Sequence, residues 1–292
     1  MAIVLGANQY GKAEIRFLHV RRDGDQPAPH AITDLNVSVT LAGELTATHL
    51  SGDNSAVLTT DAQKNTVYAF AQEHGVGAIE DFALRLARHF VASQAAICFA
   101  RVTVEQYPWE RLDGHSFARS GREIRTATVS HDGTDSWVVS GLRDLTVLKS
   151  AGSEFWGFAR DRYTTLTETS DRILATAVDA RWRHARPETA GGEPGWAESY
   201  GAAREAMLAA FAGTHSYSLQ QTLFAMGQRV LASRPEIAEI RLALPNKHHF
   251  EVDMSPFGLA STGEVFSVSD RPYGLIEGTI TRDDAPPAGK AW

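Results

Sequence analysis

The sequence contains very little cysteine. Its 292 residues include one, Cys98, so the chain can form no internal disulfide and no zinc site built from cysteine pairs. Cys98 lies in the apolar run 95–100, and we therefore expect it to be a small buried hydrophobic residue.

Long apolar runs and an excess of basic residues are also absent. No stretch has membrane-spanning length, and no basic region followed by an apolar one begins the chain. The formal net charge is -7, which argues against nucleic acid and anionic membranes as partners because phosphate binding needs clustered Lys and Arg. We therefore expect a globular cytoplasmic protein with neither kind of partner.

The motifs of several common enzyme classes are missing as well. We find no glycine-rich phosphate loop after a strand, no Gly-x-Ser-x-Gly and no His-Glu-x-x-His. His248 and His249 are adjacent, but on a strand their rings point to opposite faces. Such a pair cannot easily bind one ion, so no metal site is expected.

What the sequence does contain is a succession of alternating strands and amphipathic helices. In the first half these are strands 9–20 and 32–50, helices beginning near 60 and 79, and strands 95–104 and 123–129. In the second half they are strands 137–149 and 172–183, helices around 200–211 and 219–230, and strands 237–253 and 273–280.

Two strands, two helices and two strands are therefore predicted twice, in units 1–133 and 134–292. Because short turns join consecutive strands, we expect antiparallel sheets with helices on one face, an α+β fold. The Gly- and Pro-rich segment 187–196 is a predicted loop, and the polar tail 283–289 is expected to be loose. Exposed sheet edges are commonly covered by assembly, so we expect an oligomer.

The stretch 244–253 is unusual for a strand. Alternation places Asn246 and His248 on one face with Phe250 and Val252, where an unpartnered amide or imidazole would be costly to bury. The two side chains can be satisfied by neighbouring backbone, or they can serve a ligand or a proton relay. This stretch alone leaves both interpretations open.

Four more polar residues lie in apolar or helix-capping surroundings, namely Lys12, Thr60, Arg172 and Gln220. Each has a structural explanation. Alternation places Lys12 opposite Ile15, on a solvated face, and Thr60 can simply cap a helix. The Arg172 side chain can pair with Asp171 or Glu168, and Gln220 can be a solvated residue in the first turn of its helix.

Several segments, in order along nearly the whole chain, resemble the urate oxidase (uricase) family. They are Asn8-Gln9-Tyr10-Gly11-Lys12, Thr60-Asp61-Ala62-Gln63-Lys64-Asn65-Thr66, Leu145-Thr146-Val147-Leu148-Lys149-Ser150, Phe155-Trp156-Gly157-Phe158, Tyr163-Thr164-Thr165-Leu166 with Asp171-Arg172-Ile173-Leu174, and Leu244-Pro245-Asn246-Lys247-His248. Any one of them could arise by chance, but together they are highly specific.

The resemblance implies the tunnelling fold (T-fold), in which each half is a two-strand, two-helix, two-strand unit. Four chains of that family build a barrel, a homotetramer with active sites between subunits. The implied activity is oxidation of urate by O2 and water to 5-hydroxyisourate and hydrogen peroxide in purine degradation, with neither metal nor organic cofactor.

The same resemblance implies the residues that bind urate. They are Thr60, Asp61, Phe155, Arg172, Leu219, Gln220 and Asn246. The planar fork of Arg172 suits a flat anion, and the amide of Gln220 offers a donor and an acceptor to the opposite edge. Phe155 stacks on the ring. Leu219 stands where related sequences often have valine, and the family uses its backbone N–H.

Lys12, Thr60 and His248 match the catalytic proton relay of the family, and Asn246 matches the amide beside the oxygen position. Lysine can act as a base only if its pKa is lowered. Since Lys12 and Thr60 lie in the first half and His248 in the second, the resemblance requires a composite site whose two sets lie on different subunits.

Three alternatives remain. One is a pterin or purine enzyme of different chemistry, although relatives of that kind usually have glutamate where Gln220 stands. A second is a binding protein without turnover, and a third is a copper oxidase. The chain ends in Gly289-Lys290-Ala291-Trp292 and not in a peroxisomal Ser-Lys-Leu type signal, which favours the cytoplasm.

Overall fold

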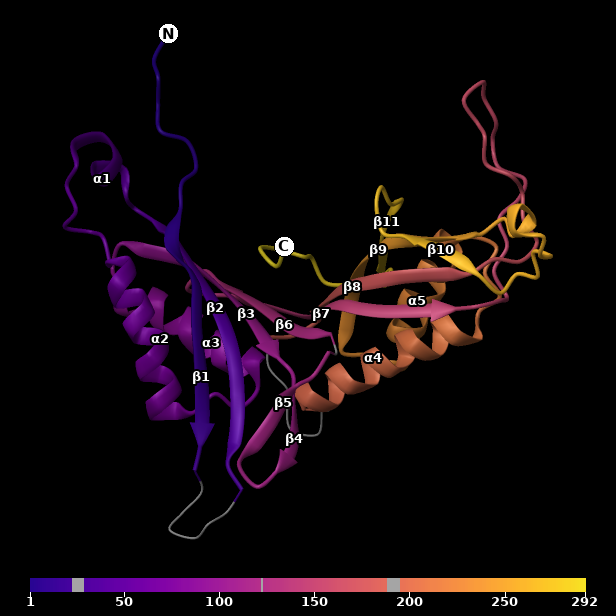
Figure 1. Ribbon diagram of the computed structural model, residues 1–292. Coiled ribbons are helices and arrows are strands. Elements are labelled where there is room, and N and C mark those ends of the chain that lie inside the picture. Colours follow the sequence, from indigo (N-terminus) through magenta and orange to yellow (C-terminus); the bar gives the residue numbers. More distant parts are fainter. Residues whose placement is uncertain (23–28, 122, 188–194) are drawn as a thin grey trace. The chain divides into compact units, whose positions relative to one another are not determined.

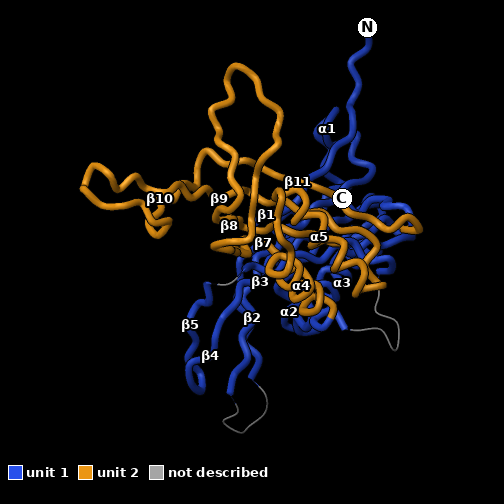
Figure 2. Tube along the Cα trace, turned by 90° about the vertical axis from the view of Figure 1, so that its right-hand side faces the viewer, with its two compact units in different colours: residues 1–141, 183–198, 286–292 blue, residues 142–182, 199–285 orange. Residues whose placement is uncertain are grey.

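The computed structural model describes residues 1–22, 29–121, 123–187 and 195–292 (Figure 1). Most of the predicted loop 187–196 therefore lies outside the described residues. The contacts divide the chain into two compact units (Figure 2). Unit 1 comprises residues 1–141, 183–198 and 286–292, and unit 2 comprises residues 142–182 and 199–285. No helix in the described part of the chain is long and apolar enough to cross a membrane.

Unit 1 begins with two long antiparallel strands and continues through helices to further strands. Its elements are β1 (Tyr10–Arg21), β2 (Ala31–Gly43), α1 (Thr46–Ser51), α2 (Thr60–His74), α3 (Ile79–Ser93), β3 (Ile97–Tyr107), β4 (Trp109–Asp113), β5 (Ser116–Arg119) and β6 (Ile124–His131). The strands pair in the order β1-β2-β3-β6, and α2 and α3 lie against one face of them (Figure 1). A core with Leu35, Phe82 and Phe90 fills the space between helices and strands.

Two details of this unit differ from the prediction. The strand predicted over 32–50 ends at Gly43, and the short helix α1 follows it. The hairpin β4–β5 was not predicted, because all five residues of β4 are exposed and carry no buried alternation.

Unit 2 repeats the same order of elements. It contains most of β7 (Ser136–Lys149), β8 (Leu174–His184) and α4 (Trp196–Gly213), all of which begin or end in unit 1. It continues with α5 (Leu219–Ser233), β9 (Ile237–Glu251), the 3-10 helix η1 (Ser255–Phe257), β10 (Phe266–Ser269) and β11 (Leu275–Thr281). Strand β9 pairs antiparallel with both β10 and β11. Its core includes Trp182, Met207, Met226 and Leu242.

The α+β fold is thus confirmed, with the order of two strands, two helices and two strands present twice. The additional elements are α1, the hairpin β4–β5, and the segment with η1 and β10. A local irregularity also recurs. Glu14 in β1 and Asp144 in β7 have positive φ angles of 59° and 65°. The N–H of each donates to a side chain on the next strand, Ser38 and Asp179. This recurrence matches the predicted repeat, whose boundary at 133/134 stays a prediction.

Cys98 is exposed, so the prediction of a buried residue was wrong. The pairs Gly43–Ile97 and Ala42–Phe99 leave Cys98 as an extra residue of β3. A β-bulge of this kind reverses the alternation at that point. Ile97 consequently joins the buried face and Cys98 turns to solvent.

The end of the chain from residue 286, which includes part of the predicted loose tail 283–289, belongs to unit 1. The Arg183 guanidinium donates to the Pro286 carbonyl at 2.9 Å. Arg101 donates to the carbonyls of Lys290 at 3.0 Å and Trp292 at 2.8 Å. Polar composition indicated mobility here, but these arginines on β3 and β8 hold the backbone.

Candidate functional site

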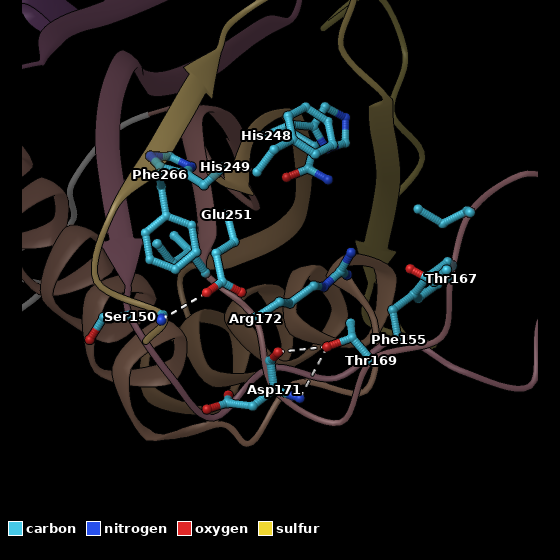
Figure 3. Close-up of a pocket in the computed structure, with 15 residues that line it drawn as sticks. Ser150, Phe155, Thr167, Thr169, Asp171, Arg172, His248, His249, Glu251 and Phe266 are labelled. Carbon is cyan, nitrogen blue, oxygen red and sulfur yellow. Dashed lines mark hydrogen bonds between the residues drawn. The ribbon is translucent and has the colours of Figure 1, made fainter. Parts of the chain in front are cut away.

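Unit 2 contains a cavity of about 510 Å³ that collects four of the predicted site residues (Figure 3). Phe155, Arg172, Asn246 and His248 all line it. The other lining residues are Ser150, Leu166, Thr167, Thr169, Asp171, Ile173, His249, Phe250, Glu251, Gly263 and Phe266. The segment between β7 and β8 and the end of β9 supply most of these side chains. Sequence reasoning missed Glu251 and Phe266, because strand alternation does not indicate that β10 pairs with the end of β9.

The guanidinium of Arg172 stacks over the Phe155 ring, with its central carbon 4.8 Å from the ring centroid. A cation above an aromatic face is attracted by the ring quadrupole. Burial lowers the pKa of Arg172, and an arginine remains protonated even so. In Figure 3 the side chain extends toward the middle of the cavity. The structure thus places the Arg172 cation over one face of Phe155, the candidate stacking residue.

Arg172 has no carboxylate partner among the residues that the structure describes. The two candidates are engaged elsewhere, since Asp171 accepts from the Gly152 N–H at 2.9 Å and Glu168 from the Gly157 N–H at 3.0 Å. The Nε of Arg172 is buried without a hydrogen-bond partner. The ion pair with Asp171 or Glu168, which the sequence left open as a structural explanation for Arg172, is therefore not formed. A buried donor without a partner is costly, which favours a ligand at this position.

A ladder of backbone hydrogen bonds connects this pair to the start of α5. Phe155 and Thr169 exchange hydrogen bonds of 2.9 and 3.0 Å. On the other side, the Glu154 N–H donates to Ser216 O at 2.7 Å and the Ser216 N–H to Gly152 O at 3.0 Å. The Arg172 N–H donates to Ser153 O at 2.8 Å. The positions of Phe155 and Arg172 are thus coupled to the segment that enters α5.

Leu219 and Gln220 are the first two residues of α5. The helix is capped by Ser218, whose hydroxyl accepts from the Gln221 N–H at 3.1 Å. The Leu219 side chain is buried, so only its backbone can face a ligand. Gln220 is exposed and does not line the cavity. The structure therefore brings four predicted residues of this unit together and leaves the Gln220 amide in solvent, outside the cavity.

Asn246 and His248 lie near the end of β9 and are both half-buried. The His248 ring stacks on Phe250 with centroids 5.8 Å apart. Phe250 is 54% exposed, so the prediction of a buried apolar face was wrong. The helix-covered core ends at Leu244, and β9 continues beyond it. In the described ranges neither the side-chain amide of Asn246 nor the His248 ring has a hydrogen-bond partner. This favours a role in ligand binding or in a proton relay over hydrogen bonding to neighbouring backbone.

The two adjacent histidines of β9 both line the cavity, but Figure 3 shows their rings pointing away from one another. His249 Nδ1 lies 3.1 Å from Lys247 O. Across the described parts of the chain, no group of three His, Cys, Asp or Glu residues could hold a metal ion.

In unit 1, Lys12 lies on the helix-covered face of the sheet. It pairs with Val39, and Ile15 pairs with Val37, so β1 has one extra residue between these pairs. Residues that are paired across two neighbouring strands point to the same face of the sheet, and both valines belong to the core. The prediction that Lys12 and Ile15 point to different faces of the sheet was therefore wrong, because the bulge reverses the alternation.

Thr60 and Asp61 form the first turn of α2. The cap is Thr59, whose hydroxyl accepts from the Ala62 N–H at 3.1 Å, so Thr60 does not have the capping role that was considered. Its hydroxyl has no hydrogen-bond partner among the described residues. Hydrogen bonding by Lys64 and the positive charges of Lys64 and Lys12 hold the pKa of Asp61 below its usual range.

Gly11 positions Lys12, and its replacement provides a test. A Cβ at this position would lie 1.8 Å from the Val39 carbonyl oxygen. We expect Gly11→Ala to push β1 from β2 and to destabilise the protein by about 2–3 kcal/mol, as overpacking does. The measurement is the melting temperature beside Gly6→Ala, since a Cβ at Gly6 meets nothing within 4 Å. Equal melting temperatures for the two variants would contradict this close approach.

The comparisons with known proteins agree along the chain. A family model described as Uricase matches residues 8–130 and 138–277. The uricase of Arthrobacter globiformis is 48% identical over 99% of this chain and 94% of its own length. The uricase of Emericella nidulans is 39% identical over 95% of this chain and 97% of its own length.

Solved structures give the same result. The crystal structure of the Arthrobacter globiformis uricase has a TM-score of 0.92 at 48% identity, covering 98% of each chain. The urate oxidase of Bacillus sp. TB-90, at 23% identity and a TM-score of 0.80 over 94% of this chain and 100% of that one, shares the fold. These matches in sequence and structure show that the chain belongs to the uricase family of oxidoreductases.

Proposed function

We propose that this protein oxidises urate with O2 and water to 5-hydroxyisourate and hydrogen peroxide, with neither metal nor organic cofactor. Membership of the uricase family supports urate as the substrate. In this reaction urate loses two electrons, O2 gains them as peroxide, and water supplies the new hydroxyl group. The observation that carries the proposal within the site is the Arg172 guanidinium over Phe155, whose buried Nε has no hydrogen-bond partner among the described residues.

In the proposed complex, urate takes the place of the Arg172 guanidinium over the Phe155 ring and lies flat against it, while Arg172 bonds one edge of urate at two points. The Gln220 amide and the Leu219 backbone N–H close on the ring from the start of α5, where backbone donors are free. Urate is anionic, and the cavity offers Arg172 as a cation without a carboxylate partner in the described ranges. These contacts provide binding and orientation.

Deprotonation is the proposed catalytic step. O2 does not readily take electrons from the urate monoanion, so removal of a further proton must first make the ring more electron-rich. Lys12 is the proposed base, Thr60 passes the proton on, and His248 completes the relay. The backbone N–H groups at the start of α2, with Asp61, border the same position. Asn246 lies beside the proposed site of O2.

The proposed composite site needs more than one chain. Lys12, Thr60 and Asp61 belong to unit 1, and the residues of the cavity belong to unit 2. We infer a homotetramer in which each active site takes these two sets from different subunits. The exposed apolar residues of unit 2, among them Phe250, Val268 and Leu275, supply surface for such assembly.

The test is consumption of urate by protein dialysed against a strong chelator and checked for metal content. We expect the loss of urate absorbance to be unchanged by dialysis and to be matched by hydrogen peroxide formation. Activity lost on dialysis and restored by copper would replace this proposal with a copper oxidase. Tight urate binding without consumption would indicate a binding protein, and pterins or other purines would then be screened.

A further inference from the structure

An ion pair outside the cavity connects the two segments that carry the urate-binding side chains. His215 Nε2 donates to Glu154 Oε1 at 2.6 Å. The other carboxylate oxygen of Glu154 accepts from the Trp156 indole N–H at 2.6 Å. Glu154 directly precedes Phe155, and His215 lies four residues before Leu219. Neither side chain lines the cavity.

We propose that Glu154 and His215 are positioning residues. They hold the Phe155 segment and the start of α5 in a fixed relative position, so that Arg172 and Gln220 bind the two edges of urate at the same time. This inference rests on the proposed function for its substrate. It concerns residues that neither contact urate nor take part in the relay.

The backbone around this pair supports the inference. The Ser216 backbone bonds to Gly152 and Glu154, which leaves the ion pair directly beside that ladder. Ser216 also has a buried side chain, whose hydroxyl donates to Ser218 O at 3.0 Å and accepts from Thr222 Oγ1 at 2.8 Å. Displacement of Ser216 would therefore be transmitted directly to the N-cap of α5 and to the residues that follow it.

A second contact fixes the residue directly before His215 in the same segment. Lys149 Nζ donates to Thr214 O at 2.5 Å and lies 5.4 Å from the centroid of the Phe211 ring. Lys149 thus holds the chain where α4 ends, and His215 holds it one residue later. Because Thr214 and His215 are both held, the short connection from α4 enters α5 from a fixed start, which limits movement of Gln220.

The carboxylate is held in its charged form at this position. Hydrogen bonds from His215 and Trp156 lower the pKa of Glu154. A group with a lowered folded-state pKa stabilises the fold above its ordinary pKa and loses that contribution as the pH falls. The Glu154 carboxylate is accordingly charged through the neutral range, and it loses the hydrogen bonds that it accepts from His215 and Trp156 only as the pH falls.

The experiment compares Glu154→Ala and His215→Ala with His215→Gln, which can place an amide nitrogen near the position of Nε2. We expect each alanine variant to raise KM for urate about fivefold, the effect of one partly exposed charged hydrogen bond, with kcat changed less than twofold. The double alanine variant should be no worse than either single one. His215→Gln should restore most of the affinity.

The matched control is Glu236→Ala, which breaks the ion pair with Arg234 at the other end of α5. It should lower the melting temperature and leave KM unchanged. If Glu154→Ala and His215→Ala behave like this control, or if their effects on KM add in the double variant, the positioning role is wrong.

Hydrogen exchange of residues 214–222 separates this inference from the proposed function. If the unaltered protein consumes no urate, the proposed function fails and the role of the ion pair is judged by exchange alone. Faster exchange of this segment in Glu154→Ala than in Glu236→Ala would support the inference, and equal exchange would overturn it.

Discussion

Arg172→Ala is expected to raise KM for urate about 100-fold, with a much smaller effect on kcat. The change removes two charge-assisted hydrogen bonds, worth about 3 kcal/mol together, and the cation that neutralises the substrate. It also removes the group that stacks over Phe155 at 4.8 Å. Arg172→Lys should lose most of the same affinity, because a lysine keeps the charge but not the planar fork.

The control for this prediction is Arg160→Ala. Arg160 also lies over an aromatic ring, with its central carbon 5.1 Å from the Phe158 centroid, but it does not line the cavity. Its loss should leave KM within about twofold of the original value, as surface substitutions usually do. The measurement is the steady-state rate across a range of urate concentrations, which gives KM for both variants. An unchanged KM in Arg172→Ala would show that the guanidinium does not bind urate.

Lys12→Met is expected to lower kcat about 1,000-fold while urate still binds. Methionine keeps the length and apolar stem of lysine but cannot accept or donate a proton, and general base catalysis contributes factors of this size. Thr60→Ala should reduce kcat in the same direction, since it removes the hydroxyl that passes the proton. Its backbone N–H remains at the start of α2.

Binding and turnover must be measured separately for these variants. Equilibrium titration with urate measures binding. Single-turnover consumption of urate with peroxide formation measures turnover. Lys290→Met is the control, because Lys290 pairs with Asp132 in unit 1 at 3.0 Å and belongs to no proposed step. A Lys12→Met variant that loses binding and retains its kcat would assign this lysine to substrate binding instead of to the relay.

Local rules predicted most elements of the fold. The apolar stripe of Ile79, Ala83, Leu86 and Phe90 predicted α3, and all four residues are buried. Strand alternation predicted β1 and β7. Both ends of β1 and the first residue of β7 differ from the prediction by one residue, and the last residue of β7 agrees with it. These predictions succeed because side-chain periodicity depends only on backbone geometry within one element.

Local rules failed where an extra residue or a distant contact intervened. Lys12 and Cys98 were assigned to the wrong faces, because β-bulges in β1 and β3 reverse the alternation and leave no clear mark in the sequence. The end of β9 was expected to be buried on one face. Burial there depends on where the helices end, and periodicity within β9 does not contain that information.

The sequence by itself determined the family, the order of the elements and the chemical types available for the site. Specific segments such as Asn8–Lys12 and Leu244–His248 carry that information along the chain. Only the tertiary structure decided that Arg172 stacks over Phe155 and is not paired with Asp171 or Glu168. It also decided that the Glu154–His215 pair connects the two binding segments. The reason is physical: these contacts join residues on separate elements, and their distances are set by how strands and helices pack, which no local pattern specifies.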